Sequence, residues 1–226
     1  VSFNDVVVDP DGKVRRALLI AEQINPMGNV TLFSFSLQLA TRYLATQDMG
    51  PTASPHNPDY MQLGSTTLFP LTGGAGGYAV EDTAGYQIML DYRDRLTPSR
   101  EVTLLEVLND EVDPAWVKDK IVLIGITAPS VKDLFYTPFT AGTQDDTHQM
   151  PGVVVHAQMV SQLLDLALGD RPLMGTSEPW QEWLWCLGWG LLGGTLAWYL
   201  RHPVMLTASQ SSLFVGIAAG GYGLFL

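Results

Sequence analysis

The apolar tail of the chain restricts what it can fold into more than any other feature. Over residues 180–226 only two side chains, Glu182 and Arg201, carry a charge. Residues 180–200 are long enough for a helix of about 30 Å, which matches the hydrocarbon core of a bilayer. Residues 204–226 form a second apolar run after a short polar turn. We therefore predict two transmembrane helices, the second truncated at the end of the chain. A hairpin buried in a soluble protein is the alternative, but it would need a larger chain to cover it.

The ends of the first run predict how the protein is oriented. Aromatic residues flank this run, as they do at membrane interfaces; they are Trp180, Trp183, Trp185, Trp198 and Tyr199. Arg201 and His202 lie in the turn between the two runs, and turns that carry positive charge stay in the cytoplasm. We therefore expect a multi-pass protein of the plasma (inner) membrane, with residues 1–179 extracellular or periplasmic.

The net charge belongs to residues 1–179. The chain has 23 acidic and 12 basic residues and a net charge of −11, and the two charges beyond residue 179 cancel. An acidic surface argues against nucleic acid as a partner, because that affinity depends on Lys and Arg. Cys186 is the only cysteine, so an intrachain disulfide is impossible. The partners that we expect are membrane lipid and an unknown extracellular ligand or stimulus.

Strand and helix patterns alternate through residues 1–172, the predicted outer domain. Residues 3–20 predict a hairpin around the turn "DPDG", whose Pro and Gly favour a tight turn. The other predicted elements are helices at 31–45, 103–110 and 152–168 and strands at 86–93 and 121–125. Uninterrupted apolarity at 121–125 indicates a strand that is buried on both faces. We predict an α/β fold in which a mixed or mostly parallel sheet is flanked by helices. A linker at 173–179 then leads to the transmembrane α-helices.

The loop after the predicted 121–125 strand carries two candidate ligand-binding residues, Asp133 and Thr137. Ligand crevices in α/β sheets open beyond the ends of strands. The Asp133 carboxylate can accept hydrogen bonds from a ligand, or it can cap the turn by accepting them from backbone N–H groups, and we favour the cap. We interpret the Thr137 hydroxyl as fixing the loop rather than acting as a nucleophile.

His156 is the third ligand-binding candidate. At 100° per residue, the polar residues of the 152–168 helix gather on one face; they are Gln158, Ser161, Gln162 and Asp165. His156 falls on the opposite, apolar face, where an imidazole needs a hydrogen-bond partner. That partner can be a carbonyl, a loop carboxylate or a ligand.

No catalytic residue, metal site or cofactor is predicted. A metal at His156 would need two or three more ligands. His148, Asp145 and Asp146 lie nearby, but in a loop that we interpret as solvated. Asp9 and Asp11 lack the later ligands of a calcium-binding loop, so we interpret both as turn residues.

Several segments together resemble a known family. They read "FNDVVVDPDGKVRRALL", "IMLDYR", "KDKIVLIGITAPSVKDLFYTPF" and "MPGVVVHAQMVSQLL". This combination resembles the second type of CHASE domain, a cyclase/histidine-kinase-associated sensory extracellular domain. The resemblance implies a bacterial sensory domain, prominent in cyanobacteria, that signals through membrane helices, usually three, to a cytoplasmic effector. That effector would be a histidine kinase, a Ser/Thr kinase or a nucleotide cyclase.

The resemblance also sets the limits of the expected function. We expect residues 1–172 to be the C-terminal portion of the sensory domain, preceded in the family by a membrane helix and a further strand–helix portion. We expect this segment not to be an enzyme and to form a homodimer through its transmembrane helices. The alternative is a membrane-anchored extracytoplasmic hydrolase that uses Asp133 and His156.

Overall fold

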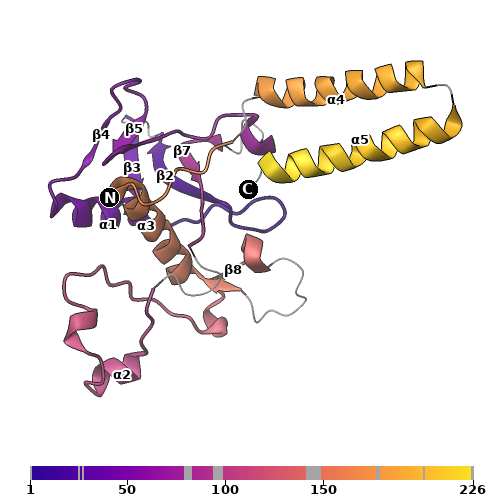
Figure 1. Ribbon diagram of the computed structural model, residues 1–226. Helices are drawn as coiled ribbons and strands as arrows, with labels where there is room; N and C mark the ends of the chain where they lie inside the picture. The colour runs from indigo at the N-terminus through magenta and orange to yellow at the C-terminus, as the bar shows by residue number, and fades with distance from the viewer. Residues whose placement is uncertain are drawn as a thin grey trace. The chain divides into compact units, whose positions relative to one another are not determined.

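The computed structural model divides into two compact units, and each is described by itself (Figure 1). The first unit comprises Val1–Gly73 and Tyr78–Gly175, and the second comprises Gly74–Gly77 and Thr176–Leu226. The structure describes residues 2–24, 26, 28–78, 83–93, 99–140, 149–176, 179–200 and 202–224. The predicted loop residues Asp145, Asp146 and His148 and the turn residue Arg201 therefore lie outside the described residues.

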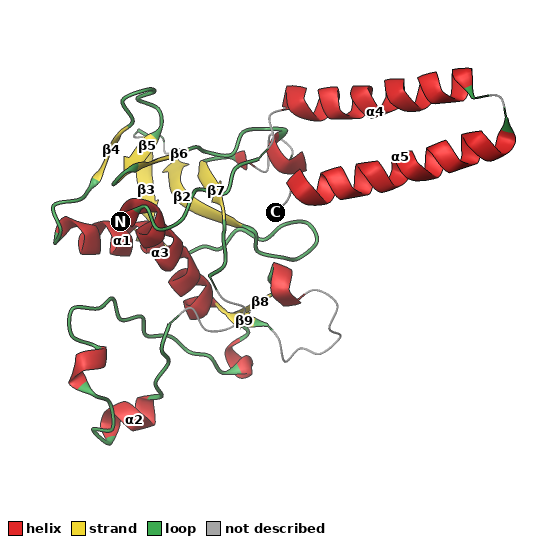
Figure 2. Cartoon of the chain, viewed as in Figure 1, coloured by secondary structure: helices red, strands yellow, loops and turns green. Residues whose placement is uncertain are grey.

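A four-stranded sheet forms the centre of the first unit (Figure 2). Its strands are β1 (Ser2–Phe3), β2 (Arg16–Gln23), β3 (Val30–Ser34) and β7 (Tyr86–Met89), in the order β1-β3-β2-β7. β1 runs parallel to β3, whereas β2 runs antiparallel to both β3 and β7. Two kinds of sheet are predicted above, a mixed one and a mostly parallel one. The observed sheet is mixed, so the mostly parallel alternative is wrong.

The turn "DPDG" forms as predicted, but the hairpin around it does not. The N–H of Gly12 donates to the Asp9 carbonyl at 2.8 Å, and the N–H of Asp9 donates to the Lys13 carbonyl at 2.8 Å. The expected first arm, residues 6–8, lies outside the described strands. β2 instead pairs antiparallel with β3 through Ile20–Gln23 and with β7 through residues 16–20.

Two helices of the first unit, α1 (Phe35–Ala45) and α3 (Gly152–Leu168), lie side by side. Ser34 caps α1, since its hydroxyl accepts the N–H of Leu37 at 3.2 Å. The predicted 31–45 helix therefore starts later, because residues 30–33 pair with β2 and Ser34 pairs with Phe3 of β1. α3 has the predicted bounds, and Gly169 ends it in the left-handed conformation, with φ of 78°.

The core of the unit fills the space between α1, α3 and one face of the sheet. Side chains alternate between the two faces of a strand, and Ala17, Leu19 and Ile88 point into this core. They pack there with the apolar faces of the helices, including Leu37, Leu44, Val155, Met159 and Leu163. The residues between them, such as Arg16 and Gln87, therefore point to the opposite face of the sheet.

Two smaller sheets and several short helices complete the first unit. β4 (Pro51–Ala53), β5 (Met61–Leu63) and β6 (Thr66–Leu68) form an antiparallel meander, and β8 (Leu134–Phe135) pairs with β9 (Met150–Pro151). α2 (Leu104–Leu108) confirms the helix predicted near 103–110, and a capping box between Thr103 and Glu106 starts it. The 3₁₀ turns of this unit include Pro114–Trp116, Pro129–Val131 and Pro138–Thr140.

The predicted strand at 121–125 is wrong for this structure. These residues belong to no strand in the described part of the chain, and Ile124 is 95% exposed. Gly125 instead lies against α3, where a Cβ added to it would approach the Val153 side chain within 2.5 Å. An apolar run shows only that a segment can be buried, whereas strand formation needs an edge with which to pair.

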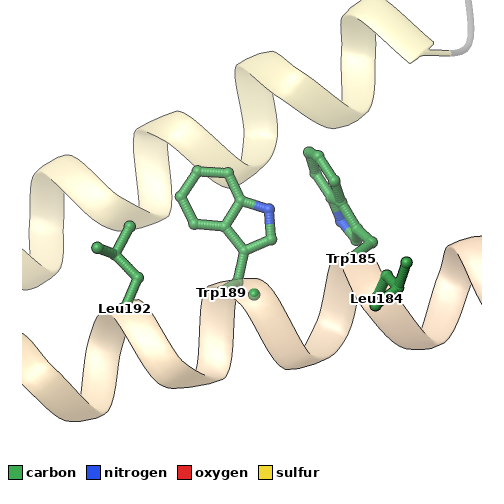
Figure 3. Close-up of a pocket in the computed structure, with 5 residues that line it drawn as sticks. Leu184, Trp185, Trp189 and Leu192 are labelled. Carbon is green, nitrogen blue, oxygen red and sulfur yellow. The ribbon is translucent and has the colours of Figure 1, made fainter.

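The second unit contains two long helices, α4 (Pro179–Tyr199) and α5 (Pro203–Leu224). The rings of Trp185 and Trp189 point from α4 toward the neighbouring helix (Figure 3). There they lie against Gly220 and Gly216, at which an added Cβ would meet the indole rings at 2.8 and 3.2 Å. The two rings also contact each other edge to face, with centroids 5.4 Å apart.

One helix among the described residues, α5, is long and apolar enough over Pro203–Tyr222 to cross a membrane. α4 forms where the other span is predicted, but the same criterion of length and composition does not identify it as a span. It bears a shallow apolar pocket of about 210 Å³ next to Gly188. Large apolar side chains on the outward faces of both helices are exposed; examples are Trp183, Leu187, Leu191, Phe214 and Val215.

Candidate functional site

His156 lies where three parts of the first unit meet: α3, α1 and the segment after β1. Its Nδ1 is 3.0 Å from the Ser36 hydroxyl of α1, and its Nε2 is 3.1 Å from the backbone carbonyl oxygen of Asn4. The ring of Phe35 meets the imidazole edge to face, with centroids 5.6 Å apart. Both ring nitrogens of His156 therefore have partners within the protein.

The partners of His156 determine its tautomer when it is neutral. A carbonyl oxygen can only accept, so Nε2 carries the hydrogen and donates it to Asn4. Nδ1 is then an acceptor, and the Ser36 hydroxyl donates to it. The sulfur of Met159 lies 3.7 Å from the same hydroxyl and is a second, weaker acceptor.

The surroundings of His156 lower its pKa. Burial has the largest effect and disfavours the charged imidazolium. The hydrogen bond to the Asn4 carbonyl and the negative charge of Asp133 act in the other direction, because both favour the imidazolium. Burial prevails, so the pKa of His156 lies below its ordinary value of about 6.5.

Asp133 lies at the N-terminus of α3. Its backbone carbonyl accepts the N–H of Gly152, the first residue of the helix, at 3.0 Å. Its carboxylate covers the Cα of Gly152, so that an added Cβ would lie 2.5 and 2.6 Å from the two carboxylate oxygens. A negative charge here stabilises the positive end of the helix dipole. The structure thus brings Asp133 and His156 to the same end of α3.

Thr137 lies beyond β8 and is fully buried. Its neighbour Tyr136 is held by backbone pairing, since the Tyr136 carbonyl accepts the N–H of Val14 at 2.9 Å. A ligand arriving from solvent therefore cannot reach the Thr137 hydroxyl in this conformation. Of the three predicted site residues, Asp133 and His156 lie together, and Thr137 is inaccessible.

The hydroxyl next to His156 is also inaccessible. Ser36 has no exposed surface, and it lies inside the contact between α1 and α3. A nucleophile must reach the substrate, so this Ser–His contact does not form a hydrolytic site. What the arrangement can do is bind or release a proton at His156.

Sequence reasoning missed a buried ionic network on the sheet face opposite the helices. The Asp9 carboxylate accepts from Arg16 Nε at 2.8 Å, from Arg15 at 2.8 Å and from the Tyr78 hydroxyl at 2.9 Å. Arg16 also donates to Gln87 at 3.1 Å and stacks over the Tyr78 ring at 4.3 Å. Burial and the bond to Asp9 raise the pKa of Tyr78.

The turn interpretation of Asp9 and Asp11 was therefore incomplete. Asp11 is exposed and pairs with Arg15 at 2.6 Å, which holds the pKa of its carboxyl well below the usual range. Asp9 is 5% exposed and joins the turn to the sheet. The position of Arg16 could have indicated this network. Its neighbour in the strand, Ala17, is a core residue, so the Arg16 side chain points to the opposite face of the sheet.

The polar face of α3 is buried as well. The Gln162 side-chain amide donates to the Met89 carbonyl at 2.9 Å, and the Gln158 side chain accepts the N–H of Arg93 at 2.9 Å. Asp165 pairs with the Arg93 guanidinium at 3.0 Å. These side chains cover backbone groups along and beyond β7, the last strand of the sheet. A helical projection shows that polar residues share a face, but it cannot show whether solvent or a strand lies there.

Comparison with known proteins assigns the family. No curated protein and no solved structure matches the chain. The family model of the CHASE2 domain matches residues 1–195, which include the whole first unit and most of α4. The sequence resemblance is thereby confirmed: the chain belongs to the CHASE2 domain family, whose members are sensory extracellular domains of signalling receptors.

Proposed function

We propose that the chain is the input segment of a membrane-bound bacterial receptor. The first unit senses a ligand or stimulus outside the cytoplasm, and α4 and α5 connect it to a cytoplasmic effector. The observation that carries this proposal is the family match, which runs without interruption from the sensory unit into α4. α3, which holds His156, ends only about ten residues before α4 begins.

The dimensions and surface of the helix pair support two membrane spans. α4 has 21 residues and α5 has 22. At 1.5 Å per residue each is roughly 30 Å long, which is enough to cross the hydrocarbon core. Large apolar side chains cover the outward faces of both helices, for example Leu187 on α4 and Phe214 on α5. Lipid is the solvent that such faces require.

Coupling requires that the stimulus favour one of two states of the first unit. A ligand that binds both states equally shifts nothing, however tightly it binds. α3 is the element through which a shift would reach the membrane, because the chain passes from it directly into the linker. Arg171, between α3 and this linker, pairs with Asp91 at 3.3 Å, so the segment that leads into the linker is tied to the sheet region.

The effector is proposed from the family resemblance to be a histidine kinase, a Ser/Thr kinase or a nucleotide cyclase. Two spans return the chain to the side on which the first unit lies. An effector in the cytoplasm therefore needs a third span after α5, which agrees with the usual number of helices in the family.

We also propose that the receptor is a homodimer that pairs through its transmembrane helices. Gly190 and Gly194 form a GxxxG motif on α4, and a Cβ added to either would meet nothing within 4 Å. The corresponding glycines of α5, Gly216 and Gly220, are occupied by the tryptophan rings of α4. The motif on α4 is therefore left for another helix, and GxxxG surfaces suit close helix pairing.

Cysteine accessibility tests the proposed orientation. In a Cys186→Ser background, Met174→Cys places a thiol in the linker and His202→Cys places one in the turn; both positions are exposed. An impermeant maleimide added to intact cells should label the first variant at once and the second only after lysis. The opposite pattern would contradict the proposal, and so would equal labelling of both variants.

A further inference from the structure

We propose that His156 is a proton-binding site that makes the contact of α3 with α1 and the N-terminal segment depend on pH. Its role in signalling rests on the sensory function proposed above, whereas proton binding itself does not. Neutral His156 holds the three parts together, and acidification loosens them.

The geometry places one titratable ring at a three-way junction. The imidazole contacts Ser36 and Phe35 of α1 and the Asn4 carbonyl after β1. The Asn4 contact spans 152 residues of sequence and the Ser36 contact spans 120. A change at one nitrogen of this ring therefore acts on contacts between segments that are distant in the chain.

Both charge states of the ring can be accommodated, but not equally well. In the neutral state the Ser36 hydroxyl donates to Nδ1 at 3.0 Å. In the charged state both ring nitrogens donate, so the Ser36 oxygen must accept and its hydrogen must turn to the Met159 sulfur, 3.7 Å away. Protonation thus exchanges a good acceptor for a poor one and places a charge inside the junction.

In the part of the chain that the structure describes, few charged groups lie near His156, and they come from identifiable segments. From the loop before β8, Asp133 faces the ring and favours its protonation. From the N-terminal segment the facing group is the neutral Asn4 carbonyl, and Asp5 follows it in an exposed position. From α1 the facing groups are Ser36 and Phe35, and from α3 itself the thioether of Met159 lies near the Ser36 hydroxyl; all of these are uncharged. Among the described residues, only Asp133 opposes the effect of burial by its charge.

The sign of the effect follows from these surroundings. The pKa of His156 is lower in the folded protein than in the unfolded chain, so the unfolded chain binds the proton more tightly. The stability contributed by neutral His156 is complete above the unfolded pKa of about 6.5. It is lost as the pH falls through the folded pKa. Acidification outside the membrane would therefore loosen α3, which leads into the linker and α4.

Titration of the individual histidines in the full chain tests proton binding directly. We would follow the imidazole carbon resonances in detergent micelles from about pH 8 to about pH 5. We expect the midpoint of His156 to lie below the ordinary histidine value of about 6.5. Asp133 is exposed, and Asp133→Asn should lower the His156 midpoint further, because it removes the negative charge that favours the imidazolium. A His156 midpoint at or above about 6.5 would overturn the proposal.

Thermal unfolding tests the structural consequence. When the pH falls from about 7.5 to about 5.5, the melting temperature of the wild-type chain should decrease more than that of His156→Gln. His56→Gln should behave like the wild type. Equal losses in all three proteins would overturn the role of His156. The cysteine labelling above tests the receptor orientation without reference to pH, so a failure of the proposed function can be told apart from a failure of this inference.

Discussion

The carboxylate of Asp9 and the guanidinium of Arg16 form an ion pair of 2.7 Å in which both side chains are almost completely buried. The pair links the turn before β2 to β2 itself, on the sheet face that the helices leave uncovered. Its charges are further satisfied by Arg15, Tyr78 and Gln87. A buried pair of this kind depends on both partners, because either charge alone would be strongly destabilising.

Removing the acid should therefore destabilise the first unit severely. Asp9→Ala leaves Arg16 charged, buried and without its main partner, and we expect a loss of about 3–5 kcal/mol in the free energy of unfolding. Chemical denaturation of the full chain in mild detergent, followed by tryptophan fluorescence and circular dichroism, measures this loss. Asp11→Ala is the matched control, since Asp11 belongs to the same turn but is exposed. An equal effect of both substitutions would contradict the role assigned to Asp9.

Gly64 and Gly12 should differ in their tolerance of a side chain. Both have positive φ, +57° and +81°, so alanine is strained by about 1–2 kcal/mol at either position. At Gly64 a Cβ would also overlap the backbone carbonyl of Ala167 at the end of α3, whereas at Gly12 it would meet nothing within 4 Å. We expect Gly64→Ala to cost at least about 1–3 kcal/mol more than Gly12→Ala. Similar melting temperatures for the two variants would show that the β5–β6 turn does not pack on α3 as described.

The glutamines of α3 should slow amide hydrogen exchange at the end of the sheet. Gln158→Met removes the acceptor of the Arg93 N–H and leaves that group unsatisfied, which costs about 1–3 kcal/mol. Amide hydrogen exchange at Arg93 should accelerate more than exchange at the core of α1. Ser161→Ala is the control on the same helix, because the buried Ser161 hydroxyl has no hydrogen-bond partner among the described residues. Its stability should be unchanged or slightly higher, and a large loss would contradict the assignment.

The proposed dimer should depend on one face of α4. Cys186 precedes Gly190 by one helical turn and is exposed, so oxidative cross-linking at this native thiol reports close approach of two α4 helices. Gly190→Leu should reduce the cross-linked fraction several-fold, since a large side chain separates the backbones. Gly188→Leu, which lies in the pocket on another side of α4, should leave cross-linking unchanged. If neither substitution alters cross-linking, the GxxxG motif is not the contact.

Local features of the first unit were predictable where neighbouring residues decide them. The bounds of α3 follow from a Pro–Gly start at Pro151 and Gly152 and a glycine stop at Gly169. The turn at 9–12 follows from Pro10 and Gly12. His156 was singled out correctly as a ring that needs partners, and a carbonyl was named among the possible ones. The helix ends and the turn depend on interactions within a few residues of sequence, and the need of His156 for a partner follows from the periodicity of its own helix.

Other features could not be predicted because they depend on pairing between distant segments. Residues 31–34 begin the stretch 31–45 in which a helix is predicted, yet they belong to β3 because β2 lies alongside them. The strand expected at 121–125 is exposed instead, and Gly125 rests on Val153. The partners of His156 could not be predicted for the same reason. Ser36 and Asn4 lie in segments far from His156 in sequence, and no sequence pattern indicates that they contact it.

The sequence by itself was enough to identify the apolar tail, the family and the ends of α3. Composition, motifs and helix caps depend only on residues that are close together in the chain. Only the tertiary structure decided that Asp9 is buried against two arginines, that the polar face of α3 covers the sheet end, and that His156 joins three segments. The physical reason is that burial and hydrogen bonding depend on what lies opposite a side chain, and in this unit the opposing group is often more than 60 residues away.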